Sequence, residues 1–150
     1  MKTLYTDASF DYHSTDATDE KIIRGKIAIA DGLAFKRVEK VVIGKVPVLK
    51  QYINILELTA IARAVEIASE GEDKAQLAIY SDSKVAVSWA SRGRVNPKVK
   101  TAAHESALEY LKKARLAFGG LVTFNFVPRE KNPAGWILER QLEIEAPHAI

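Results

Sequence analysis

The sequence contains no cysteine and only three histidines, so it has few sulfur or nitrogen ligands for a metal ion. Without cysteine, disulfides and thiolate metal sites are excluded, and metal ligands must come from oxygen atoms or from those histidines. No apolar run approaches the roughly 20 residues of a membrane-spanning helix, and the residues after Met1 lack the apolar core of a signal peptide. These absences predict a soluble protein without a targeting segment, and the lack of thiols fits the reducing cytoplasm.

What is present suits one globular domain. Of the 150 residues, 47% are hydrophobic and 27% are charged, which is enough to enclose a full core. We therefore expect a single domain over residues 1–150. The net charge of +3 is only mildly basic, so the positions of the charges matter more than their sum.

One pattern occurs twice in the chain. Residues 4–9 (LYTDAS) and 79–83 (IYSDS) both read apolar, tyrosine, hydroxyl, aspartate and small residue. In a strand, alternate side chains share a face, so two such strands lying side by side would bring Asp7 and Asp82 together. Like charges at that separation repel unless a cation lies between them. The repeat therefore predicts a divalent metal site, most simply for Mg²⁺.

The remaining patterns predict an alternation of strands and helices. An acidic stretch over residues 11–20 is interpreted as an exposed hairpin loop, and strands over 22–30 and 33–46 are joined by Asp31-Gly32. A helix from Asn54 to Gly71 has a buried stripe, and a long helix opens at Asn96-Pro97 and closes at Gly119-Gly120. Further strands are expected over 76–81 and 122–127, with a last helix to about residue 145. Because helices precede the last two strands, these should pair in parallel and give a mixed α/β sheet.

Glu57 stands out within the first predicted helix. It falls on the apolar row of Ala60, Ile61, Ala64 and Ala68, where a carboxylate is costly unless something satisfies it. Two simpler interpretations remain open. Glu57 could reach water near the helix start, and Asp82 could be a helix cap.

A basic run over residues 91–100 contains four cations and no acid: Arg92, Arg94, Lys98 and Lys100. Such a run is usually a solvated surface. Beside a metal-binding edge it becomes a candidate contact for phosphates.

The order of elements and the acidic residues resemble the ribonuclease H family over nearly the whole chain. The motifs that carry the resemblance are Thr6-Asp7-Ala8-Ser9, residues 54–58 (NILEL), 80–83 (YSDS) and 127–132 (VPREKN). It implies a five-stranded mixed sheet of order 3-2-1-4-5 with helices on both faces. The stretch after Trp89 is too short for an extra basic helix, so the chain resembles the compact members without that protrusion.

The resemblance also implies a chemistry. Members of the family cut the RNA strand of RNA–DNA hybrids with two Mg²⁺ ions, for which Mn²⁺ is a possible substitute. Asp7 would bridge both ions, Glu57 would bind one of them near the scissile phosphate, and Asp82 would help to hold the ion that activates the water. The implied partner is nucleic acid, and no obligate protein partner is evident. The residues expected to contact the substrate are Ser9, Asn54, Ser83, Lys84, Arg92, Arg94, Lys98, Arg129 and Asn132.

The chain departs from the family in its last helix. A fourth aspartate is expected four residues after the asparagine that matches Asn132, but Trp136 stands there. Glu139, one turn further along, is the candidate replacement. Alternatively, Glu139 pairs with Arg129 or Arg140 at the surface and the site has three carboxylates. The histidines His13, His104 and His148 are scattered, and each is expected at the surface.

Three functions are consistent with these residues. The first is a metal-dependent endonuclease acting on RNA–DNA hybrids. The second is a nucleic-acid-binding module that has lost catalysis with the fourth acid. The third is another nuclease of the same superfold, although Ser9 stands where the exonucleases have glutamate and nothing favours junction resolution.

Overall fold

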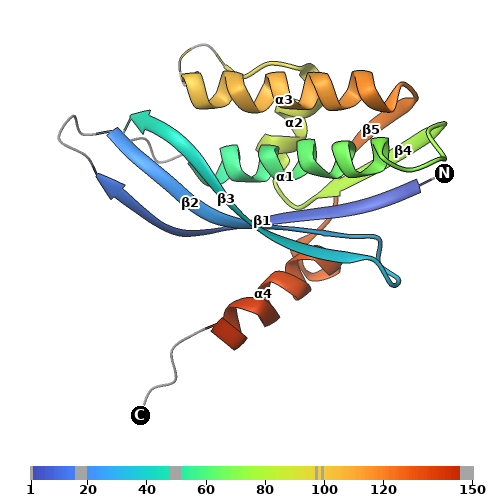
Figure 1. Cartoon of the computed structure of the whole chain (residues 1–150), viewed down its shortest axis with the longest axis horizontal. Coiled ribbons are helices and arrows are strands. Elements are labelled where there is room, and N and C mark those ends of the chain that lie inside the picture. Colours follow the sequence, from blue (N-terminus) through green and yellow to red (C-terminus); the bar gives the residue numbers. More distant parts are fainter. Residues whose placement is uncertain (1, 16–19, 48–51, 97, 99, 146–150) are drawn as a thin grey trace.

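The computed structural model describes residues 2–15, 20–47, 52–96, 98 and 100–145 (Figure 1). These residues form five strands, four α-helices and a short 3-10 helix. In chain order the elements are β1 (Lys2–Thr15), β2 (Glu20–Ala30), β3 (Lys36–Pro47), α1 (Tyr52–Ser69), β4 (Gln76–Ser81), α2 (Lys84–Arg92), α3 (Ala102–Phe118), β5 (Leu121–Phe126), η1 (Arg129–Lys131) and α4 (Pro133–Glu145).

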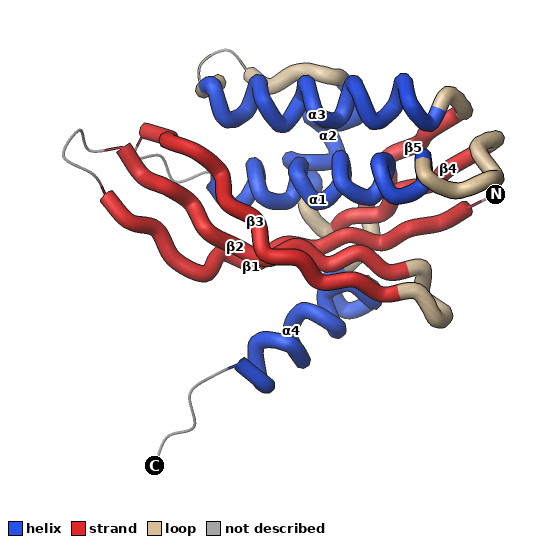
Figure 2. The backbone as a smooth tube through the Cα atoms, viewed as in Figure 1, coloured by secondary structure: helices blue, strands red, loops and turns tan. Residues whose placement is uncertain are grey.

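The strands form one mixed sheet in the order β3-β2-β1-β4-β5, as predicted. β1, β2 and β3 pair antiparallel, and Figure 2 shows these long strands side by side. β4 pairs with β1 in parallel, and β5 pairs with β4 in parallel. The helical connections before β4 and β5 require this, because a crossover returns the chain to the same end of the sheet.

Helices cover both faces of the sheet. α1, α2 and α3 lie over one face, while α4 crosses the other (Figure 1). The predicted stripe of α1 is fully buried, as in Leu58, Ile61 and Val65, and it packs into the main core. A smaller cluster of Ala28, Ala134 and Leu138 holds α4 against the sheet.

The first hairpins differ from the prediction. β1 continues to Thr15 because its second half keeps pairing with β2, so residues 11–15 are strand and not loop. Residues 16–19 of the predicted acidic loop lie outside the described part of the chain. The turn between β2 and β3 is longer than two residues, because the Asp31 carboxylate accepts hydrogen bonds from the amides of Leu33 and Phe35. Leu33 is therefore in the turn and 91% exposed.

The long helix also begins later than predicted. α3 starts at Ala102, after the N-cap Thr101, instead of at Asn96-Pro97; Pro97 lies outside the described residues. His104, expected at the surface, is fully buried, because its ring completes the cap of α3. The predicted end is confirmed, since Gly119 closes the helix with a φ of 77°.

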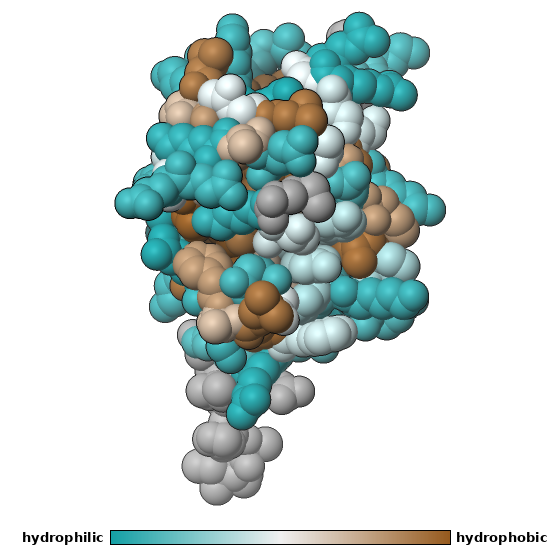
Figure 3. Space-filling model, turned by 90° about the vertical axis from the view of Figure 1, so that its right-hand side faces the viewer, coloured by the Kyte–Doolittle hydropathy of each residue, from teal (hydrophilic) through white to brown (hydrophobic). Residues whose placement is uncertain are grey.

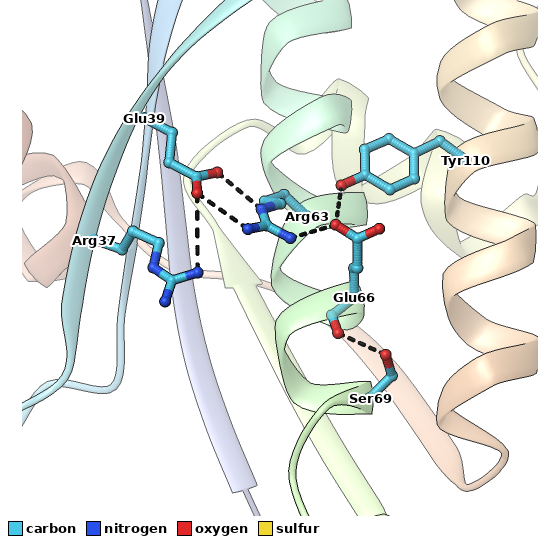
Figure 4. A network of polar contacts seen from close by, with 6 residues as sticks. All are labelled: Arg37, Glu39, Arg63, Glu66, Ser69 and Tyr110. Atoms are coloured by element: carbon cyan, nitrogen blue, oxygen red, sulfur yellow. Dashed lines mark hydrogen bonds and ion pairs between the residues drawn. The ribbon is translucent and has the colours of Figure 1, made fainter.

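A polar network joins β3, α1 and α3 (Figure 4). Arg63 of α1 donates to Glu39 of β3 at 2.8 Å and also contacts Glu66 one turn along α1. The hydroxyl of Tyr110 on α3 donates to Glu66 at 2.8 Å. The network fixes the helix that carries Glu57 relative to the sheet and to α3.

No helix of the described residues combines the length and apolarity needed to cross a bilayer. The face drawn in Figure 3 is largely hydrophilic, with hydrophobic residues in separate patches.

Candidate metal centre and nucleic-acid interface

Three carboxylates from distant parts of the sequence meet at one point of the fold. Asp7 lies on β1, Glu57 on α1 and Asp82 directly after β4. Each offers an oxygen atom, and the three atoms lie within 4.8 Å of one another. The structure thus brings together the three acids that the sequence predicted to converge.

The pairing of β1 with β4 places the two aspartates. Thr6 is opposite Ser81 in the parallel ladder, so Asp7 and Asp82 follow at the same end of neighbouring strands. The Thr6 hydroxyl donates to the Tyr80 carbonyl at 3.2 Å, and the rings of Tyr5 and Tyr80 stack at 5.3 Å. The repeated pattern in the sequence is therefore a pair of matching strand ends.

The three carboxylates are held at an electrostatic cost. Burial, and then repulsion from Asp82, raises the pKa of Asp7 to about 6. Burial, with Asp7 and Asp82 close by, holds the pKa of Glu57 well above its usual range. Glu57 is only 6% exposed, and its Oε2 atom has no hydrogen-bond partner among the described residues. Within the same residues, no lysine or arginine forms an ion pair with the three acids.

This donor set fits a divalent cation. Carboxylate oxygens are the ligands that Mg²⁺ and Mn²⁺ prefer, and the site contains no nitrogen or sulfur donor among the three side chains. A cation would satisfy the unpartnered Glu57 oxygen and remove the repulsion.

Asn132 is placed differently from the prediction. It was expected to contact the substrate, but it is fully buried. Its Nδ2 donates to the Thr6 carbonyl at 2.9 Å and to Asp82 Oδ2 at 3.3 Å, and its Oδ1 accepts from the Ala134 amide at 3.1 Å. Asn132 thus positions Asp82 and caps α4. An asparagine directly before a proline at a helix start is the sequence signal for this role.

Glu139 lies outside the three-carboxylate group. It is exposed, and the Arg129 guanidinium donates to its Oε1 at 3.4 Å. Gly135, which the sequence did not single out, lies against the group: a β-carbon there would be 3.1 Å from Asp7 Oδ2. Trp136, at the place expected for the fourth aspartate, is 55% exposed.

The other residues predicted to contact the substrate differ in exposure. Ser9 and Asn54 are half-buried, and the Ser9 hydroxyl has no partner among the described residues. Ser83 caps α2 by accepting from the Ala86 amide at 3.1 Å. The exposed cations are Lys84, whose ammonium lies over the Phe126 ring, and Arg92, Arg94, Lys98 and Arg129.

Comparison with known proteins finds similarity in structure. No family model and no curated protein matches the sequence. RNase H1 from the archaeon Halobacterium salinarum is similar with a TM-score of 0.60 and 15% identity, over 96% of this chain and 98% of that one. LC11-RNase H1, isolated from compost and solved in complex with an RNA/DNA hybrid, is similar with a TM-score of 0.55 and 20% identity, over 91% of each chain. The N-terminal RNase H domain of a Mycobacterium tuberculosis protein has a TM-score of 0.57 and 17% identity, over 91% of this chain and 95% of that one. The element order, the sheet order and these similarities together identify the chain as a protein with the ribonuclease H fold.

Proposed function

We propose that this protein is a divalent-metal-dependent endonuclease that hydrolyses the RNA strand of RNA–DNA hybrids. The observation that carries the proposal is the group of Asp7, Glu57 and Asp82, whose oxygens lie within 4.8 Å of one another and form no ion pair with a lysine or arginine among the described residues. The same fold in LC11-RNase H1 has been solved with an RNA/DNA hybrid, which supports the choice of substrate.

Asp7, Glu57 and Asp82 would hold two Mg²⁺ ions, with Mn²⁺ as a substitute. Bound ions of this kind activate a water molecule and neutralise the charge that develops on the phosphate. The protein's part is to hold the three carboxylates in place before substrate arrives, and the bound ions would favour their ionised forms. Asn132 contributes by anchoring Asp82 to β1 through two hydrogen bonds.

Glu139 enters the proposal as the fourth carboxylate. It lies four residues after Gly135 on α4, so the two share a side of the helix, and Gly135 abuts Asp7. Its pair with Arg129 is exposed at both ends, and exposed pairs contribute at most about 1 kcal/mol. Exchange of Arg129 for a bound cation would therefore cost little, and the released Arg129 would be available to a phosphate.

Polar and basic residues would bind the nucleic acid around this centre. Asn54 and Ser9 border the carboxylates and would contact the sugar of the cleaved strand, where the 2′-hydroxyl distinguishes RNA from DNA. Ser83 would contact the phosphate through its hydroxyl, which also caps α2, while its backbone amide donates to the Ser81 hydroxyl at 3.1 Å. The exposed cations Lys84, Arg92, Arg94 and Lys98 would contact phosphates along one flank.

The proposal is tested by incubating the purified protein with an end-labelled RNA–DNA hybrid in Mg²⁺ or Mn²⁺. We expect internal cuts in the RNA strand only, and their loss in Asp7→Asn, because one shared ligand of the ions is removed. An intact hybrid under both metals would contradict the proposal. Blocked substrate ends separate internal from terminal cleavage.

A binding module without catalysis is the second candidate, and two observations favour it. Trp136 occupies the place of the expected acid, and Glu139 is engaged by Arg129. This candidate predicts salt-sensitive binding of the hybrid, unchanged by Asp7→Asn, with no cleavage by either protein. A parallel titration of the two proteins decides between the candidates.

A further inference from the structure

A basic groove lies on the opposite side of the sheet from α1, beside α4. It is lined by Lys26 of β2, by Lys36, Val38 and Lys40 of β3, and by Ile137 and Gln141 of α4. We call this surface the β3 groove. Arg37 also borders it, although its guanidinium turns to Glu39 on the other face (Figure 4).

Strand pairing connects the β3 groove to the carboxylate centre. Ser9 of β1 is opposite Lys26 of β2, which is opposite Lys40 of β3. Residues directly opposite in a ladder share a face, and neighbouring strands lie about 4.8 Å apart. This row therefore leads across the sheet from Ser9, two residues after Asp7, to Lys40 over roughly 10 Å.

A second row bounds the groove at its other end. Tyr5 is opposite Ala30, which is opposite Lys36. Between the two rows, Ala28 and Val38 pack with α4 in the smaller apolar cluster. The groove therefore has an apolar middle with lysines at both ends.

Among the described residues, the charged side chains that line the β3 groove are all positive. No acid is among its lining residues, and neither Lys36 nor Lys40 has an ion-pair partner within the described part of the chain. The acid nearest in β3, Glu39, points to the other face, where Arg63 binds it at 2.8 Å (Figure 4). Lys26 is 95% covered, so its apolar stem lies in the groove floor.

We propose that the β3 groove binds backbone phosphates of the nucleic acid that occupies the carboxylate centre. Lys36 and Lys40 are exposed cations without an ion-pair partner among the described residues, and the continuity of the groove with Ser9 and Asp7 favours an anionic ligand that spans both places. A nucleic-acid strand does so, because it presents a phosphate at each nucleotide. This inference rests on the proposed function for the identity of the ligand.

The test is the salt dependence of hybrid binding without divalent metal, measured by fluorescence anisotropy. Lys36→Ala/Lys40→Ala is compared with Lys74→Ala/Lys113→Ala, which removes the same charge from exposed sites outside the groove. Each lysine–phosphate contact contributes about 0.7–0.9 to the slope of log K against log salt. We expect the groove variant to lower the magnitude of the slope by roughly 1.5 and the control to leave it near the wild-type value. Melting curves confirm that both variants fold.

Equal salt-dependence slopes for the two double variants would overturn the proposal that the β3 groove binds phosphates. The cleavage assay separates this failure from failure of the proposed function. If the wild type cleaves the hybrid and the two double variants have equal slopes, only the phosphate-binding role of the groove is rejected. A reduced slope for the groove variant without any cleavage keeps the groove and rejects the endonuclease. If the β3 groove bound an acidic protein instead of nucleic acid, the two double variants would show equal slopes for hybrid binding, and the proposal would be wrong.

Discussion

At the scale of single residues, the group of Asp7, Glu57 and Asp82 destabilises the folded protein when no cation is bound. Asp7 and Glu57 are buried, and each lies beside other carboxylates, which raises the pKa of both groups. Glu57 also has an oxygen with no hydrogen-bond partner among the described residues. A group placed at such a cost is better explained by ligand binding than by stability.

Removing one charge from the centre should stabilise the metal-free protein. Asp7→Asn abolishes its repulsion with Asp82 and the cost of burying a charge, so we expect the free energy of unfolding to rise by about 1 kcal/mol or more. The melting temperature in EDTA measures this. Asp73→Asn, in the exposed turn after α1, is the matched control and should leave the melting temperature unchanged. A lower melting temperature for Asp7→Asn would show that the aspartate supports the fold.

Asn132 should matter for stability as well as for the site. Asn132→Ala removes donors to the Thr6 carbonyl and to Asp82, and the cap of α4. We expect a loss of roughly 2–3 kcal/mol in urea unfolding, because a buried carbonyl is left unpaired and a cap is lost. Asn96→Ala, which removes only an exposed turn contact to the Lys98 amide, should cost less than about 0.5 kcal/mol. Equal losses would contradict the assigned role.

At the scale of elements, the start of α3 depends on the protonation of one side chain. The Thr101 amide donates to His104 Nδ1 at 3.0 Å, so that nitrogen must carry no proton. His104 Nε2 is buried without a partner among the described residues, and the ring packs edge-on against Trp89. Burial lowers the pKa of His104 below 6.5.

This arrangement predicts that the contribution of His104 to stability falls in mild acid, while protonation of Asp7 and Glu57 acts in the opposite direction. Because the folded state resists protonation, the contribution of His104 is complete above pH 6.5 and falls as pH drops below 6.5, towards the lowered pKa of the folded state. Titration of this one group changes the free energy of unfolding by at most about 1.4 kcal/mol per pH unit. The difference in the free energy of unfolding between the wild type and His104→Gln, followed by urea unfolding from pH 7.5 to 5, isolates this contribution because Asp7 and Glu57 titrate in both proteins. His104→Gln keeps an acceptor for the cap and should flatten this part of the profile. An unchanged profile in that variant would assign the effect to other groups.

At the scale of the whole molecule, the sheet order decides whether a metal site exists. β1 and β4 are neighbours only because the chain crosses over through α1, and the same helix carries Glu57. The network of Arg63, Glu39 and Glu66 then holds α1 to β3. The centre is thus a property of the complete domain, and ion binding should stabilise all of it.

Metal binding should therefore raise the melting temperature of the folded chain. An ion at 100 times its Kd stabilises the fold by about 2.7 kcal/mol. We expect Mg²⁺ and Mn²⁺ to stabilise the wild type, Asp7→Asn to lose most of the shift, and Glu139→Gln to show a smaller shift. A full shift in Glu139→Gln would limit the centre to three carboxylates. No shift in the wild type up to millimolar metal would contradict the metal site.

The sequence by itself determined the bounds of β4, the buried stripe of α1 and the matching patterns that place Asp7 and Asp82 at equivalent points of two strands, because strand and helix periods are local properties of the chain. It did not determine how far β1 extends, where α3 begins, or that His104 and Asn132 are buried. These depended on pairing and packing partners far away in the sequence: β2 for the second half of β1, Trp89 for His104, and Thr6 with Asp82 for Asn132. Only the tertiary structure decided that Gly135 abuts Asp7 while Glu139 meets Arg129, because the register of α4 on the sheet is set by side-chain packing, which the local sequence pattern does not encode.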